Sequence, residues 1–174
     1  MHPLNKFRFC PVCGSKHFEE NNALSKKCTD CGFTYYFNPR AATVAFIRND
    51  RKELLVARRG KEPAKGTLDL PGGFVDPCET GEEAIIREVK EETGLIAEQV
   101  TYLFSLPNIY PYSGIDIHTL DLFFSCEVSD TSRVIPMDDV AELTWMPLDH
   151  IRPEEFGLRS VRKGVEMYLA LMKK

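Results

Sequence analysis

Four of the chain's six cysteines lie within its first 31 residues, as the two pairs "CPVC" and "CTDC". Fourteen residues separate Cys13 from Cys28, and Cys10 and Cys31 complete the set. This spacing is typical of a tetrahedral zinc site made of four thiolates, which leaves no open position for catalysis. A segment this short cannot bury enough apolar surface to fold alone, so bound metal would supply much of its folding free energy. We therefore predict a small zinc ribbon over residues 1–36, with a structural Zn²⁺.

The charge of this segment leaves a second role open. Residues 1–36 carry five basic and three acidic side chains (net +2), whereas the remainder carries 17 and 23 (net −6). Nucleic-acid contact is the alternative to a structural role, through Lys6, Arg8, Lys16, Lys26 and Lys27. The surplus is small and the sequence shows no aromatic stacking pattern. We therefore favour a structural module and do not expect nucleic acid as a partner.

After "FNPR", strand and helix patterns alternate to the end of the chain. Pro39 biases the residue before it toward extended backbone, so a second domain is predicted over residues 37–174. Its predicted elements are strands 42–48 and 53–59 as a hairpin, helix 80–93, strands 100–106, 118–128 and 142–148, a loop at 107–114, and a final helix 158–174. This mixture predicts an α/β fold with helices covering a sheet.

The helix predicted from Thr80 has clear end signals. Thr80 and Glu83 form a capping box, and Gly94 provides the C-terminal stop. On a helical wheel the apolar stripe consists of Ile85, Ile86 and Val89. The side chains placed roughly opposite, and expected to face water, are Glu83, Arg87 and Lys90.

Three glutamates of this helix flank the apolar stripe instead of opposing it. Glu88 faces Glu91 and Glu92 at like-charge spacings that each cost a few tenths of a kcal/mol. The last two also lie at the helix C-terminus, where the dipole disfavours anions by ~0.3–1 kcal/mol. A solvated acidic face would stand opposite the stripe. Clustered carboxylates suit a hard divalent cation, so we predict a Mg²⁺ or Mn²⁺ site.

The segment Gly73–Leu95, "GFVDPCETGEEAIIREVKEETGL", resembles the Nudix box at every fixed position. The preceding "TLDLPG" and the later strands extend the likeness to about residues 37–174. The resemblance implies a Nudix α/β/α sandwich with a mixed sheet, in which the box is a loop–helix–loop. It also implies hydrolysis of a nucleoside diphosphate linked to another group.

The resemblance assigns roles by position. Glu88, Glu91 and Glu92, with the Gly73 carbonyl, would bind the divalent cation. Arg87 would hold the glutamates in place with help from Glu79.

A further acidic residue is expected before the strand that contains Trp145. Asp139 fills that slot as a candidate proton acceptor, and Glu142 is its competitor. A solvated loop remains the alternative interpretation of both.

The ribbon, "FNPR" and the box together resemble the NADH pyrophosphatase branch. That branch carries S-Q-P-W-P-F-P-x-S where this chain has "SLPNIYPYS", so Leu106, Asn108 and Ile109 depart from it. Phe74 matches a residue that stacks on a substrate ring, with a core aromatic as the alternative. Tyr110 and Tyr112 could stack on a base or cover the sheet.

We therefore expect hydrolysis of NADH or a related dinucleotide, with release of a nucleoside monophosphate. An NTP, damaged-dNTP or ADP-ribose pyrophosphatase is the alternative enzyme. A catalytically silent nucleotide sensor, whose ribbon binds nucleic acid, is the alternative of another class.

Composition excludes several other classes. The net charge of −4 and pI of about 5.6 provide no global basic field. No apolar run approaches the ~18 residues of a membrane span, and the first residues lack a signal-peptide pattern. We expect a cytoplasmic protein without a membrane partner, and the resemblance allows a homodimer.

Overall fold

The computed structural model describes residues 2–138 and 140–173. The chain divides into two compact units, residues 1–39 and residues 40–174, and each is described by itself.

The smaller unit is a three-stranded antiparallel sheet in the order β1-β2-β3, formed by Phe18–Asn22, Ser25–Cys28 and Thr34–Tyr36. Its buried cluster consists of Cys10, Phe18 and Cys28, with Phe33 packed against it. Two of these side chains are predicted metal ligands, so little apolar surface is available to hold the unit together without a metal.

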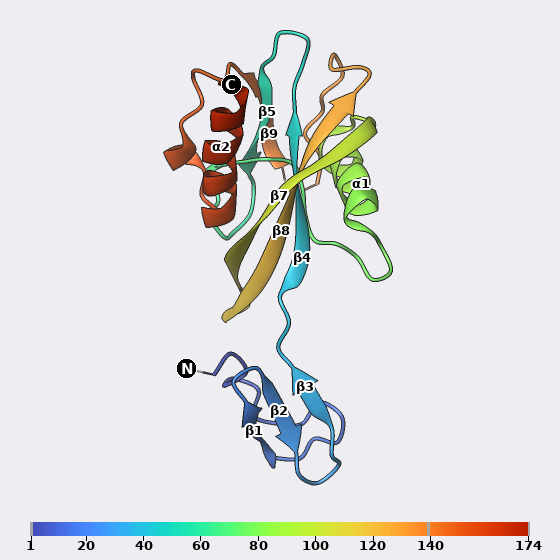
Figure 1. Cartoon of the computed structure of the whole chain (residues 1–174), viewed down its shortest axis with the longest axis vertical. Coiled ribbons are helices and arrows are strands. Elements are labelled where there is room, and N and C mark those ends of the chain that lie inside the picture. Colours follow the sequence, from blue (N-terminus) through green and yellow to red (C-terminus); the bar gives the residue numbers. More distant parts are fainter. Residues whose placement is uncertain (1, 139, 174) are drawn as a thin grey trace. The chain divides into compact units, whose positions relative to one another are not determined.

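Within its described residues, the larger unit contains two three-stranded sheets and two α-helices (Figure 1). The first sheet has the order β4-β8-β7, and the second has the order β6-β5-β9. Their bounds are β4 Arg40–Ile47, β5 Leu54–Arg59, β6 Leu68–Asp69, β7 Ala97–Tyr112, β8 Ile115–Val128 and β9 Val140–Met146. The helices are α1 Gly81–Thr93 and α2 Arg159–Met172, with a short 3₁₀ helix at Pro153–Glu155. β4 runs parallel to β8 and β7 runs antiparallel to it, so this sheet is mixed.

Both faces of β4 are buried, because a helix covers each side. Val44 and Phe46 belong to a core with residues of α2, whereas Ala45 and Ile47 belong to a core with residues of α1. Such continuous apolar strands are typical of sheets covered on both faces. Figure 1 shows α1 and α2 on opposite sides of the strands. The predicted α/β fold, with a mixed sheet and helices on both faces, is confirmed.

Helix α2 lies close against the sheet. The ring of Tyr168 stacks on Phe46 with centroids 3.9 Å apart. A Cβ added to Gly164 would lie 2.3 Å from the Phe123 ring, so glycine permits this approach.

Helix α1 begins and ends as predicted. Thr80 accepts a hydrogen bond from the Glu83 N–H within a complete capping box, and Gly94 closes the helix at φ 71°. Ile85 and Val89 are buried, but Ile86 is 39% exposed, so the prediction was wrong for this residue. Ile86 lies about 100° around the helix from Ile85, beyond the buried stripe.

The predicted hairpin of residues 42–59 is wrong in its pairing. β4 and β5 are strands, but they belong to different sheets and share only an isolated bridge between Arg48 and Leu54 among the described pairs. β4 instead pairs with β8, which is distant in sequence. Sequence periodicity identifies strands but not their partners.

Residues 107–112 were predicted as loop and are strand. β7 continues through them and turns only at Ser113 and Gly114. Pro107 and Pro111 are tolerated because β7 lies at the sheet edge, where a missing N–H breaks no ladder. This extension brings Asn108 and Tyr110 into the sheet.

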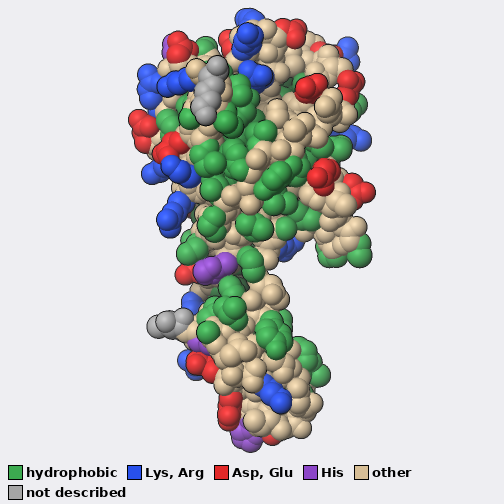
Figure 2. All heavy atoms as spheres, in the orientation of Figure 1, with side chains coloured by type: hydrophobic (Ala, Val, Ile, Leu, Met, Phe, Trp, Pro, Cys, Tyr) green, Lys and Arg blue, Asp and Glu red, His purple; other side chains and the backbone are tan. Residues whose placement is uncertain are grey.

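The surface of the larger unit also contains apolar side chains. On the face shown in Figure 2, hydrophobic side chains gather over its middle and charged ones lie around them. Tyr102, Ile109 and Leu120 are each at least 41% exposed. Within the described residues, neither α-helix has the length and hydropathy needed to cross a bilayer.

Candidate active site

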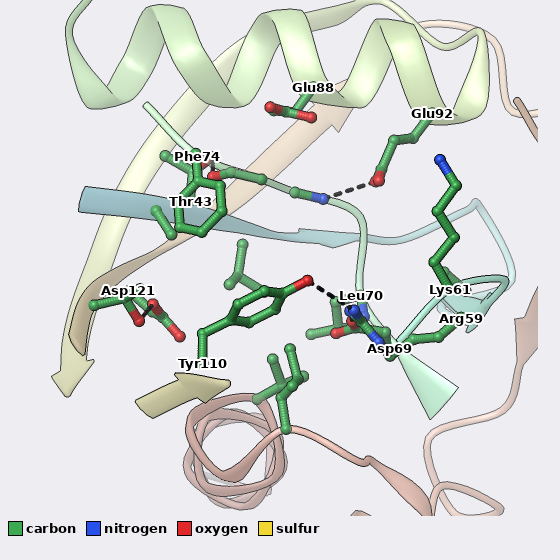
Figure 3. Close-up of a pocket in the computed structure, with 18 of the residues that line it drawn as sticks. Thr43, Arg59, Lys61, Asp69, Leu70, Phe74, Glu88, Glu92, Tyr110 and Asp121 are labelled. Carbon is green, nitrogen blue, oxygen red and sulfur yellow. Dashed lines mark hydrogen bonds and ion pairs between the residues drawn. The ribbon is translucent and has the colours of Figure 1, made fainter. Parts of the chain in front are cut away.

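A cleft of about 650 Å³ opens in the larger unit. Glu88 and Glu92 of α1 point into it from one side, and Tyr110 and Asp121 lie on the other side (Figure 3). Its volume falls within the range of small-molecule sites.

The chain before α1 is attached to β4. The Thr43 N–H donates to the Gly73 carbonyl at 2.8 Å, and the Val75 N–H donates to the Ala41 carbonyl at 3.1 Å. Gly72 has φ 148°, and a Cβ there would lie 2.1 Å from the Thr43 carbonyl oxygen. This close approach requires glycine and fixes the start of the box at the cleft wall.

Glu92 is the most strongly perturbed carboxylate of the cleft. Burial raises the pKa of Glu92 to about 8, although the Gly72 N–H donates to its Oε2 at 2.9 Å and opposes the shift. Nearby Glu88, Asp69 and Asp138 raise it further. Burial also raises the pKa of Glu88, against the effect of Arg87. This wall therefore carries excess negative charge.

Arg87 joins the box loop to the helix. Its Nε and Nη2 donate to the two oxygens of Glu79, each at 2.9 Å. Nη1 donates to Glu88 at 2.8 Å and to Glu91 at 3.0 Å, and Nη2 also donates to the Phe74 carbonyl at 3.1 Å. The prediction that Arg87 faces water is wrong, because the loop folds over the helix and covers its guanidinium. These hydrogen bonds lower the pKa of Glu79 to about 2.

The three glutamates do not converge equally. Glu88 and Glu92 line the cleft, and Glu88 lies against Gly73, where an added Cβ would be 2.5 Å from its Oε1. Glu91 is half exposed and pairs with Arg87. Among the described residues, the four cysteines alone form a group of potential metal ligands within 4.8 Å of one another.

The residues present fit a hard divalent cation. Glu88 and Glu92 offer carboxylate oxygens at one wall, and Mg²⁺ and Mn²⁺ prefer such donors. Gly73 lines the same cleft, but its carbonyl, the third predicted oxygen, accepts a hydrogen bond from the Thr43 N–H. A cation there would also stabilise the ionised carboxylates of Glu88 and Glu92, which burial and their mutual repulsion disfavour.

The acidic residues expected before β9 have different outcomes. Asp139 lies outside the described residues. Asp138, its neighbour, lines the cleft. Glu142 pairs with Arg58 at 3.1 Å and is exposed.

Phe74 and Tyr110 form an aromatic wall of the cleft. The two rings meet edge to face with centroids 5.7 Å apart, and the Arg40 guanidinium lies 4.3 Å from the Phe74 centroid. Phe74 is half-buried and lies in neither apolar core. Tyr112 also lines the cleft, but it is 60% exposed.

Sequence reasoning missed several polar residues of the opposite wall. Arg59 forms an ion pair with Asp69, and both are largely buried. Asp121 accepts hydrogen bonds from the hydroxyls of Thr119 and Ser160. The available signal was an aspartate between two leucines, which occurs in "LDLPG" and again in "LDLFF". An acidic residue inside an otherwise apolar strand pattern is a signal of a buried polar role.

The four N-terminal cysteines gather as predicted. The Sγ atoms of Cys10 and Cys31 are 3.6 Å apart, and those of Cys13 and Cys28 are 3.7 Å apart. The Cys31 N–H lowers the pKa of Cys28 to about 7, which favours the thiolate that zinc binds. The cluster can hold one zinc ion.

The same unit contains an aromatic contact that sequence reasoning missed. Phe7 stacks on Tyr35 with centroids 6.3 Å apart, and both rings are at least 40% exposed. The sequence pattern does not reveal this contact, because the two residues are 28 positions apart in sequence.

Comparison with known proteins agrees with this geometry. A NUDIX domain matches residues 38–164. The chain is 35% identical over 127 residues to an "ADP-ribose pyrophosphatase" of Methanocaldococcus jannaschii, covering 68% of this chain and 72% of that protein. It is 33% identical over 112 residues to an "NAD-capped RNA hydrolase NudC" of Vibrio atlanticus, covering 64% of this chain and 41% of that protein. The chain spans about half the length of such NudC relatives.

A solved NUDIX hydrolase from Nitrosomonas europaea shares the fold, with a TM-score of 0.72 and 21% identity. That match covers 94% of this chain and 90% of the other. The cleft contains Glu88 and Glu92, and Arg87 beside it is bound to Glu79, within a domain that has the NUDIX hydrolase fold. The chain belongs to the NUDIX family.

Proposed function

We propose that this chain is a divalent-metal-dependent pyrophosphatase that hydrolyses a nucleoside diphosphate linked to another group. The observation that carries the proposal is the pair Glu88 and Glu92, which both point from α1 into the cleft, with Glu88 against Gly73 (Figure 3). The family match over residues 38–164 supports it.

The chain's own residues divide the work. Glu88 and Glu92 would hold the cation, with Glu91 as a further candidate, while Arg87 and Glu79 fix the loop against the helix. Bound Mg²⁺ or Mn²⁺ supplies charge neutralisation for the polyanionic linkage. A carboxylate at the cleft accepts the proton of the attacking water, and the described candidates are Glu88, Glu92 and Asp138.

The reaction breaks one phosphoric anhydride bond. The water oxygen bonds to one phosphorus, and the bridging oxygen leaves with the other phosphate. For a dinucleotide the products are two mononucleotides.

We favour NADH or a related dinucleotide as substrate. The NudC relatives are named for NAD-capped RNA, and the cleft offers aromatic rings at Phe74 and Tyr110 as well as a carboxylate wall. ADP-ribose is the second candidate, because the relative named for it matches 72% of its own length.

The test is a turnover panel with Mg²⁺ or Mn²⁺, with products identified by mass spectrometry. NADH, NAD, ADP-ribose, NAD-capped RNA, diadenosine polyphosphates and damaged dNTPs belong on it. We expect release of a nucleoside monophosphate from at least one member. Glu92→Gln should lower the rate at least ~10²-fold. Glu82→Gln, an exposed change on the same helix, should leave it unchanged.

Two outcomes would contradict the proposal. Binding of these nucleotides without turnover would favour the sensor interpretation, and near-normal activity of Glu92→Gln would remove this residue from the site. The homodimer stays a prediction, which light scattering measures.

A further inference from the structure

The cleft contains a buried amide without a described partner. Asn108 of β7 is 6% exposed and lines the cleft. Among the described residues, no hydrogen bond is found for its side chain, yet no fully buried side-chain nitrogen or oxygen lacks a partner. The polar atoms of the Asn108 amide are therefore open to the cleft. Other buried polar side chains of the cleft are paired, as Thr119 is with Asp121 and Asp69 is with Arg59.

The sheet register gives this amide its direction. Asn108 lies opposite Thr119 in the β7–β8 ladder, and directly opposed residues share one face of a sheet. Tyr110, two residues further along β7, shares that face as well. The amide therefore lies between the Tyr110 ring and the Thr119–Asp121 pair.

The amide also lies across the cleft from the predicted metal wall. Tyr110 and Asp121 flank its position, and Figure 3 shows both opposite Glu88 and Glu92. A ligand whose phosphates lie at the glutamates could thus extend an attached ring toward Asn108.

A ligand that enters the cleft and displaces water from this amide must satisfy its donor and acceptor, because an amide left unpaired away from water costs free energy. A primary amide presents one acceptor and one donor side by side. Its complement is a planar group with an adjacent N–H donor and acceptor. The amino edge of adenine and the carboxamide of nicotinamide both have this arrangement.

We propose that Asn108 is a specificity-determining residue whose amide forms paired hydrogen bonds with such a ring of the substrate. This inference rests on the proposed function for the identity of the ligand. It adds a named recognition contact to the substrate class.

The test uses mononucleotides, which contain no anhydride bond, so binding is measured independently of hydrolysis. Calorimetry with the full chain in Mg²⁺ buffer would compare AMP with purine riboside 5′-monophosphate, which lacks the amino donor. A second arm would compare nicotinamide mononucleotide with nicotinic acid mononucleotide, which replaces the carboxamide by a carboxylate. The arm that shows discrimination identifies the ring that Asn108 contacts.

We expect wild-type protein to prefer the donor-bearing ligand of one arm by roughly 5- to 100-fold, as for one bidentate pair. Asn108→Leu should reduce that preference to about 2-fold or less. Gln99→Leu removes an exposed amide from the same strand and should retain the full preference.

The stability of Asn108→Leu provides a second measurement. Because the amide has no described partner in the protein to lose, the melting temperature of the variant should stay close to that of wild type. A marked loss would mean that the amide is satisfied within the protein and would contradict the inference.

Equal binding of both members in both arms, discrimination retained by Asn108→Leu, or no mononucleotide binding at millimolar concentration would each overturn the inference. Hydrolysis of a dinucleotide would stand in all three cases, so the two proposals fail separately.

Discussion

The guanidinium of Arg87 donates hydrogen bonds to both carboxylate oxygens of Glu79, with Nε and Nη2 each 2.9 Å from their acceptors. This bidentate pair links the box loop to the helix that carries the glutamates. A planar fork matches a carboxylate in a way that an ammonium cannot.

Replacing Arg87 by Lys should therefore lower activity by about 10- to 100-fold, the range of supporting contacts around a metal site. The charge remains, but the simultaneous contacts to Glu79, Glu88 and Glu91 are lost. Steady-state rates at saturating Mn²⁺ would measure the effect. Lys90→Arg, an exposed change on the same helix, is the control. Full activity in Arg87→Lys would show that geometry at this position is dispensable.

Two adjacent glycines should respond differently to alanine. Gly72 has φ 148°, and a Cβ added there would collide with the backbone of β4. Gly72→Ala should therefore destabilise the fold by ~3 kcal/mol or more. At Gly73 the Cβ meets the Glu88 carboxylate, which can move aside. Gly73→Ala should therefore stay folded but lose Mn²⁺ affinity. Denaturant unfolding and metal titration separate the two effects, and equal loss of stability in both would refute this distinction.

Acid should remove the contribution of Glu79 to stability. Its folded-state pKa is about 2, below the usual 4.5. The contribution is therefore present above about pH 4.5 and is lost as pH falls toward 2. In EDTA, the melting temperature of wild type should exceed that of Glu79→Gln near neutral pH. The difference in melting temperature should narrow as the pH falls from about 4.5 toward 2. A difference that stays constant from pH 6 to pH 3 would contradict this role of Glu79. The control Glu82→Gln should differ little from wild type in melting temperature at any pH.

The cysteines should differ in reactivity. Cys78 is exposed, whereas Cys126 is buried and burial raises its pKa to about 12. With one zinc per chain on the N-terminal cluster, iodoacetamide should modify Cys78 first. A strong chelator should then release one zinc and make the four cluster cysteines reactive. Mass spectrometry after timed alkylation measures this, and equal reactivity of all six before chelation would contradict the zinc site.

Local sequence signals were sufficient to predict those features of the structure that depend only on residues close together in the chain. Thr80, Glu83 and Gly94 specify the ends of α1 because caps act over one helical turn. The two C-x-x-C pairs identified the sulfur cluster for the same reason, because each pair brings its two cysteines together within one local turn.

Relations across the fold were not available from periodicity. The pairing of β4 with β8 instead of β5, and the continuation of β7 through two prolines, depend on which strands become neighbours. Arg87 was expected in water because a helical wheel contains no loop that folds back over the helix.

The sequence by itself determined the helix of glutamates, the four-sulfur cluster and the α/β character, because each is encoded by residue type at short spacing. Tertiary structure alone decided that Asp69, Asn108 and Asp121 share a cleft with Glu88 and Glu92. These residues lie on separate strands and a helix, and packing around a common sheet brings their side chains together.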